Sequence, residues 1–144
     1  MVSVIIPTLN AGENLAACLN TFVDGAVTGI VREVVIVDGG STDQTLEIAN
    51  GFGAKVISAK PSRGHQLAVG AHAAKSDTLL FVHADTVLDD GWETDIEAFV
   101  AQEAVVAGAF LLKFASKSMA PRIVAAGANF RTLARMLPLS LIHI

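Results

Sequence analysis

The sequence predicts an α/β domain with a doubly wound, mostly parallel sheet that carries helices on both faces. Two observations indicate this class. Short apolar runs rich in β-branched residues alternate along the chain with amphipathic, helix-type patterns. These apolar runs are continuous, as is typical of strands that are buried on both faces of a parallel sheet. Because no internal repeat or Pro/Gly/Ser-rich linker divides the 144 residues, we expect a single domain over 1–144.

The first strand is predicted at 3–8, where SVIIPT is a β-branched run closed by a turn. Asn10, with Glu13 three residues later, has the spacing of a capping box, so a helix should follow. Its apolar face would consist of Leu15, Leu19 and Phe22. The second strand, 33–38, is the run EVVIVD.

Ser41 and Gln44 repeat the capping-box spacing and predict a second helix, which should end near Gly51 and Gly53 because glycine favours helix C-termini. The third strand is predicted at 54–59. The later elements are a helix rich in small residues at 63–75, a strand at 78–84, a helix at 89–102 with Asp89 and Asp90 in its first turn, a strand at 105–114 and a helix at 119–137. The small residues of 63–75 should allow that helix to approach the sheet closely.

Composition narrows the class of protein. A hydrophobic content of 52% with 17% charged residues is not that of a disordered chain. The mean hydropathy is +0.54, yet no apolar run reaches the roughly 18 residues of a membrane span. The start of the sequence has no signal-peptide pattern, and the single cysteine, Cys18, is expected to be a buried core residue, so we expect a cytoplasmic protein.

Charge is distributed unevenly along the chain. All 14 acidic residues lie in 1–103 together with five of the ten lysines and arginines, whereas 104–144 holds the other five basic residues and no acid. Such a basic, apolar segment predicts peripheral contact with an anionic membrane or self-association. The alternative is that it faces an acidic partner segment.

Polar residues follow the predicted strands at the edge where ligands bind in doubly wound sheets, outside the carboxyl ends of the strands. We therefore expect residues from distant parts of the chain to meet in one crevice. These residues are Pro7, Thr8, Asn10, Asp38, His83 and Asp85.

Asp38 ends an apolar strand and precedes Gly39 and Gly40. Its carboxylate could accept hydrogen bonds from ribose hydroxyls or from a base edge, while the glycines let a ligand approach the backbone. The alternative is a structural carboxylate that caps the next helix through backbone N–H groups.

Asp85 offers the hard oxygen that Mg²⁺ or Mn²⁺ prefers, with substrate phosphates and water as further ligands. His83 would share its side of the strand and ligate the metal or donate to phosphate. The alternatives are a turn cap for Asp85 and a packed, hydrogen-bonded imidazole for His83. Arg63 stands at a predicted helix start, where a guanidinium beside helix N–H groups binds anions, unless it is a solvated loop arginine.

Several other phosphate-binding and catalytic patterns are missing from the sequence. It has no G-x-x-x-x-G-K-[ST] P-loop, no G-x-G-x-x-G after the first strand, no G-x-S-x-G elbow and no zinc-type Cys/His spacing. A dinucleotide oxidoreductase is therefore not favoured, and we expect no nucleic-acid partner.

Three motifs, VSVIIPTLNAGENL, EVVIVDGGSTDQT and LLFVHADT, resemble in order and spacing the family 2 glycosyltransferases of GT-A fold. The resemblance covers roughly residues 1–100. The HADT form, preceded by SRGHQLAVGA, resembles the bacterial arsenosugar-type subgroup.

The resemblance implies a metal-assisted, inverting transfer of a sugar from a UDP- or GDP-linked donor to an acceptor that the sequence does not identify. Pro7, Thr8 and Asn10 would line the nucleotide pocket, and Asp38 would hold the base or ribose. Asp85 would match the last acid of the family's D-x-D motif, which binds Mg²⁺ or Mn²⁺ and the diphosphate. His83 replaces the first acid of that motif, which should weaken or alter metal dependence.

The family's catalytic base is an Asp or Glu after the fifth strand, but this sequence has no acid beyond Glu103. The segment GANFRTLARMLPLS resembles the helix before the base, and the final LIHI does not resemble the family's continuation. We therefore expect an incomplete C-terminus, with the base absent and the donor half kept. One alternative is a non-catalytic module that binds nucleotides or sugar nucleotides. Another is a nucleotidyltransferase, although the Gly-rich loop of that family is missing.

Overall fold

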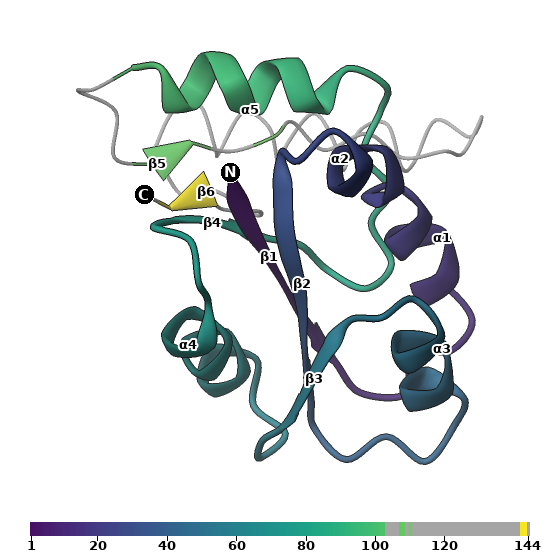
Figure 1. The fold of residues 1–144 in the computed structure, drawn as a ribbon. Coiled ribbons are helices and arrows are strands. Elements are labelled where there is room, and N and C mark those ends of the chain that lie inside the picture. The colour runs from purple at the N-terminus through teal and green to yellow at the C-terminus, as the bar shows by residue number, and fades with distance from the viewer. Residues whose placement is uncertain (103–106, 109, 111–141, 144) are drawn as a thin grey trace, which may run out of the picture.

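The computed structural model describes residues 1–102, 107, 108, 110, 142 and 143 (Figure 1). The predicted helix at 119–137 lies outside these residues, as does most of the basic segment.

Within the described residues, the strands form one sheet in the order β3-β2-β1-β4-β6-β5. The first four strands are parallel, whereas β6 runs antiparallel to both β4 and β5. Their bounds are Val2–Thr8 (β1), Val31–Asp38 (β2), Lys55–Ser58 (β3), Thr78–Phe81 (β4), Ala107–Gly108 (β5) and Ile142–His143 (β6). The predicted mostly parallel sheet is confirmed, and the antiparallel β6 was not foreseen.

Helices cover both faces of the sheet, as the sequence predicted (Figure 1). The helix α4 lies on one face, and the others lie on the opposite face. Their bounds are Leu15–Asn20 (α1), Val23–Val27 (α2), Thr45–Gly51 (α3), Arg63–Ala73 (α4) and Trp92–Val100 (α5).

The core follows the alternation of side chains along β1. Val4 and Ile6 point to the face that carries α1 and α5, where they join the larger apolar cluster with Leu15 and Trp92. Ile5 points to the other face and packs in a smaller cluster under α4. Burial on both faces explains why the apolar run of β1 is continuous.

The helix α4 approaches the sheet closely at Gly70, as its small residues predicted. A Cβ atom at Gly70 would lie 2.4 Å from Cγ2 of Ile5 and 3.0 Å from Cγ2 of Val37. Only a residue without a side chain fits against β1 and β2 at this position.

The predicted capping box at Asn10 and Glu13 is wrong. The helix α1 begins later, at Leu15, and Asn14 precedes it without a side-chain cap. Asn10 instead has a positive φ of 51°, and its side-chain oxygen accepts a hydrogen bond from the backbone of Thr42. A partner 32 residues away replaces the local cap.

The capping box at Ser41 and Gln44 is also wrong, because α3 begins at Thr45 and has no side-chain cap. The hydroxyl of Ser41 instead donates a hydrogen bond to the carboxylate of Asp38. The predicted end of this helix is confirmed, since α3 stops at Gly51 and Gly53 has a φ of 71°.

The fourth strand and the following helix are shorter than predicted. The strand β4 ends at Phe81, and α5 begins at Trp92 after Gly91, whose φ is 88°. Asp89 and Asp90 therefore precede the helix, and the acids of its first turn are Glu93 and Asp95. The left-handed residue Gly91 sets this start, and the sequence pattern did not reveal it.

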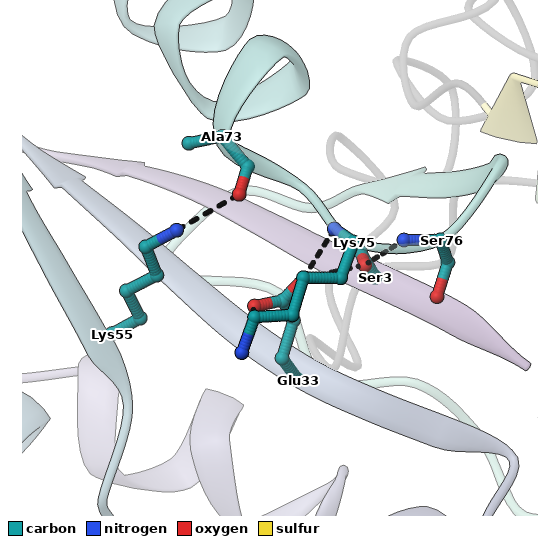
Figure 2. A network of polar contacts seen from close by, with 6 residues as sticks. All are labelled: Ser3, Glu33, Lys55, Ala73, Lys75 and Ser76. Atoms are coloured by element: carbon teal, nitrogen blue, oxygen red, sulfur yellow. Dashed lines mark hydrogen bonds and ion pairs between the residues drawn. The ribbon is translucent and has the colours of Figure 1, made fainter.

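Near the starts of β1 and β2, a polar network ties the connection between α4 and β4 to the sheet (Figure 2). Oε1 of Glu33 accepts hydrogen bonds from Ser3 Oγ (3.0 Å) and the Lys75 backbone (2.6 Å), and Ser3 accepts one from the Ser76 backbone. The Lys75 ammonium lies 3.8 Å from Oε2, close enough for an ion pair but too far for a hydrogen bond. The network lies near the starts of β1 and β2, at the opposite end of these strands from Thr8 and Asp38.

Among the described residues, no helix is both long and apolar enough to cross a bilayer.

Candidate functional site

A cavity of about 430 Å³ opens at the carboxyl edge of the sheet. Six of the seven residues that the sequence singled out line it: Pro7, Thr8, Asn10, Arg63, His83 and Asp85. The seventh, Asp38, is not a lining residue, although it is the partner of Thr8 in the register of β1 and β2.

Asp38 lies beneath the cavity wall, with only 2% of its surface exposed. Its Oδ2 accepts hydrogen bonds of 2.8 Å from the backbone N–H groups of Gly40 and Ser41. Its Oδ1 accepts from the hydroxyls of Ser41 and Thr8, the latter at 3.0 Å.

A carboxylate has about four acceptor positions, and the chain itself uses four at Asp38. A ribose hydroxyl would therefore bind here only by replacing one of these donors. The carboxylate holds the turn at Gly40 and Ser41, which comes before α3, so it does not cap the helix itself. Its contact with a ligand stays a prediction.

The electrostatics of Asp38 favour the ionised form. Burial raises the pKa of the Asp38 carboxyl, but hydrogen bonds from Ser41, Gly40 and Thr8 together outweigh burial and lower the pKa below its usual value. The group is a fixed negative charge at neutral pH, next to Thr8, which lines the cavity.

Two loops, residues 8–12 and 38–45, are joined side by side by hydrogen bonds between side chains and backbone. The Asn10 backbone donates to Ser41 Oγ, and the Thr42 backbone donates to Asn10 Oδ1, both at 2.8 Å. Gly12 donates to Asp43 Oδ2 at 2.9 Å, and other hydrogen bonds to Asp43, chiefly from Thr45, help to lower its pKa. The loop after β1, which lines the cavity, is thus held in place by the loop after β2.

Gln66 is a site residue that the sequence reasoning missed. It is 5% exposed, and its side-chain amide donates to the backbone carbonyls of Thr8 (2.9 Å) and Val37 (2.8 Å). It thereby ties α4 to the ends of β1 and β2 and also lines the cavity. The sequence did offer one sign of this role, because Gln66 is a polar residue within the helix pattern rich in small residues.

His83 and Asp85 lie in a turn beyond β4, so the prediction that they share one side of the strand is wrong. The sheet pairing ends with the Val82 N–H donating to Ile5, and the Thr86 N–H then closes a turn on the carbonyl of His83 at 3.0 Å. Both side chains nevertheless line the cavity, and Asp85 is exposed.

The donor set around Asp85 suits a hard cation that takes most of its ligands from elsewhere. Within the part of the chain that the structure describes, no group of three or more His, Cys, Asp or Glu residues could enclose a metal ion. Mg²⁺ and Mn²⁺ sites commonly use one or two protein carboxylates and complete the shell with phosphate and water. An exposed carboxylate that faces a cavity fits that arrangement.

Cys18 is fully buried, as predicted, and lies under the turn that carries Asp85. Its thiol donates to the carbonyl of His83, with 3.5 Å between sulfur and oxygen. Burial raises the pKa of the Cys18 thiol to about 12; the charge of Asp85 adds to the rise, and a backbone hydrogen bond from Thr86 opposes it. The thiol is therefore a neutral donor at physiological pH.

Arg63 is the first residue of α4 and lines the cavity beside Ser62. Ser62 occupies the N-cap position but makes no side-chain cap hydrogen bond. Arg63 and the N-cap residue of α4 thus line the same cavity, a combination that suits an anion.

The parallel strand order, the helices on both faces and the cavity at the carboxyl edge define the GT-A, Rossmann-like class of fold. The model of the family described as glycosyl transferase family 2 matches residues 3–135. The chain belongs to this family.

Relatives of known name agree with this membership. The chain is 40% identical over 115 residues to a PGL/p-HBAD biosynthesis glycosyltransferase of Mycobacterium bovis, a match that covers 70% of this chain and 40% of the relative. It is 33% identical over 98 residues to the glucosyl-3-phosphoglycerate synthase of Mycolicibacterium smegmatis, covering 62% of this chain and 32% of that protein. The chain thus spans well under half the length of these relatives.

Solved structures share the fold. The glucosyl-3-phosphoglycerate synthase of Mycobacterium tuberculosis, in complex with Mn²⁺ and UDP-glucose, superposes with a TM-score of 0.70 at 21% identity, covering 99% of this chain and 55% of that one. S. aureus TarS 1–349 gives a TM-score of 0.70 at 23% identity, covering 99% of this chain and 46% of its own.

Proposed function

We propose that this chain binds the nucleoside diphosphate sugar donor of a family 2 glycosyltransferase, which transfers the sugar to an acceptor with inversion. The observation that carries the proposal is the cavity at the carboxyl edge, where an exposed Asp85 faces the wall formed by Thr8 and Asn10. The Mycobacterium tuberculosis structure of the same fold, which holds Mn²⁺ and UDP-glucose, supports it.

The residues divide into two parts of the donor site. Pro7, Thr8 and Asn10 form the nucleoside side, supported from below by Asp38. Asp85 lies on the diphosphate side, where it would hold Mg²⁺ or Mn²⁺ with phosphate oxygens.

The metal, when bound, would neutralise the charge that develops on the departing nucleoside diphosphate. His83 and Arg63 line the same cavity and can donate to phosphate oxygens. Their donors add to the stabilisation of the leaving group. The acceptor and the base that deprotonates it are left unassigned.

The basic segment of the sequence adds a proposal about location. Residues 104–144 contain five basic residues and no acid, a composition that attracts anionic lipid headgroups. We propose peripheral contact of this segment with an anionic membrane on the cytoplasmic side. Salt-sensitive co-sedimentation with vesicles that contain phosphatidylserine, but not with neutral vesicles, is the expected result.

Isothermal titration calorimetry of the full chain tests the donor site. UDP and GDP are each titrated with Mn²⁺, with Mg²⁺ and with EDTA. We expect one of the two nucleotides to bind, and to bind more tightly with metal. If neither nucleotide binds under any of these conditions, the proposal is wrong.

A sugar-transfer assay separates the enzyme from its alternative. Transfer of the sugar to any member of a broad acceptor panel would exclude a non-catalytic binding module. Release of pyrophosphate from a nucleoside triphosphate would instead indicate a nucleotidyltransferase.

A further inference from the structure

Cys18 contacts His83, the first residue of the turn that carries Asp85. Its thiol donates to the carbonyl of His83 at 3.5 Å. The N–H of Thr86 also closes the turn onto the carbonyl of His83 at 3.0 Å. One buried side chain thus donates to the same carbonyl that accepts the hydrogen bond closing the turn.

The turn at 83–86 needs such a contact because it belongs to no helix or strand. The strand β4 stops at Phe81 and the next helix, α5, starts only at Trp92. Cys18, by contrast, belongs to α1 and is fully buried in the main apolar cluster. It connects an irregular segment to a fixed part of the core.

The chemistry of the thiol suits this position. A neutral donor adds no charge beside Asp85, whereas an acid there would compete for a cation and a base would repel one. Its small volume fits the buried face of α1, and Asp85 remains the acidic residue among those that line the cavity.

We infer that Cys18 is a positioning residue that holds the His83–Thr86 turn so that Asp85 faces the diphosphate and its metal ion. The inference rests on the proposed function, because the benefit of a fixed Asp85 is tight binding of the metal with the nucleotide. Cys18 touches neither ligand in this arrangement, so its effect passes through the turn.

Three variants of the full chain test the inference. Cys18→Val keeps a similar volume without a donor, and Cys18→Ser keeps a donor. Leu19→Ala is the matched control, because Leu19 is a buried residue on the same helix that lacks this contact with the turn. The first readout is hydrogen exchange of the peptide 82–88 without metal, and the second is the affinity for Mn²⁺ at saturating UDP.

In Cys18→Val we expect exchange within 82–88 to be about three- to tenfold faster and Mn²⁺ affinity to be about three- to tenfold weaker, which is the factor of one neutral hydrogen bond. UDP affinity in EDTA should not change. Cys18→Ser should recover most of both losses, and Leu19→Ala should show neither beyond its global loss of stability.

The possible failures are distinguishable. If the wild type binds UDP but no Mn²⁺, the proposed metal site is wrong, and the inferred role of Cys18 in positioning Asp85 for the metal is wrong as well. If the wild type binds Mn²⁺ and Cys18→Val matches it in affinity, the inference alone is overturned, whatever the exchange data show. Equal losses in Cys18→Ser and Cys18→Val would also overturn it, since packing rather than the donor would then explain both.

Discussion

The hydroxyl of Thr8 donates a 3.0 Å hydrogen bond to Oδ1 of Asp38, and the two residues lie opposite each other at the carboxyl ends of β1 and β2. This buried contact couples the cavity wall to the charge beneath it. Thr8 lines the cavity and Asp38 does not. Asp38 would therefore affect a bound ligand largely through its hydrogen bonds to Thr8 and to Ser41.

The first prediction concerns this contact. Thr8→Val preserves the shape of the side chain but removes one donor to a buried carboxylate, so we expect a loss of about 1.5–3 kcal/mol in the free energy of unfolding. Urea denaturation measures the loss. Thr28→Val is the control, because Thr28 donates only to backbone carbonyls at an exposed helix end. Similar losses in both variants would contradict the prediction.

The second prediction concerns pH. The pKa of Asp38 is lowered in the folded state, so its contribution to stability is present above the unfolded value of about 3.9 and is lost as the pH falls through the lower, folded value. The wild type should therefore lose more free energy of unfolding between pH 6 and pH 3 than Asp38→Asn does. Urea denaturation at both pH values gives the comparison, and parallel losses in the two proteins would show that Asp38 is not the source.

The third prediction concerns the metal. Asp85→Asn should remove the metal-dependent part of nucleotide binding, about 1–3 kcal/mol or roughly five- to 150-fold in affinity, and should leave binding in EDTA unchanged. Calorimetry with Mn²⁺ and with EDTA measures both. Asp77→Asn removes the same charge from an exposed position outside the cavity and should bind like the wild type. A metal enhancement that survives in Asp85→Asn would rule out this carboxylate as the ligand.

The fourth prediction concerns the contact between α4 and the sheet. Gly70→Ala places a methyl group 2.4 Å from Ile5, so the helix must shift and stability should fall by about 1–3 kcal/mol. Gly64→Ala, on the same helix with nothing within 4 Å, should be neutral or stabilising by up to about 1 kcal/mol. Thermal and urea unfolding of the pair give the difference. A neutral Gly70→Ala would mean that α4 packs less tightly than the distance indicates.

Sequence patterns located the four parallel strands and the residues that follow them because both depend on local information. A continuous β-branched run such as 3–8 indicates a buried strand, and parallel strands bring their ends to one edge of a sheet. Pro7, Thr8, Asn10, His83 and Asp85 could therefore be expected in one crevice, where the structure places them, whereas Asp38, expected with them, is not a lining residue. The three motifs also indicated the family to which the chain belongs.

Tertiary structure alone decided which groups these residues contact. Asn10 and Ser41 each have the local spacing of a helix cap, but they bond to each other's loops across 31 or 32 residues of sequence. The carboxylate of Asp38 accepts hydrogen bonds from its own turn and from Thr8. The side chain of Gln66, on α4, donates hydrogen bonds to the ends of two strands. Such partners are chosen by which loops the sheet brings together, and a buried polar group takes the partner that the packed fold supplies even where a local one is available.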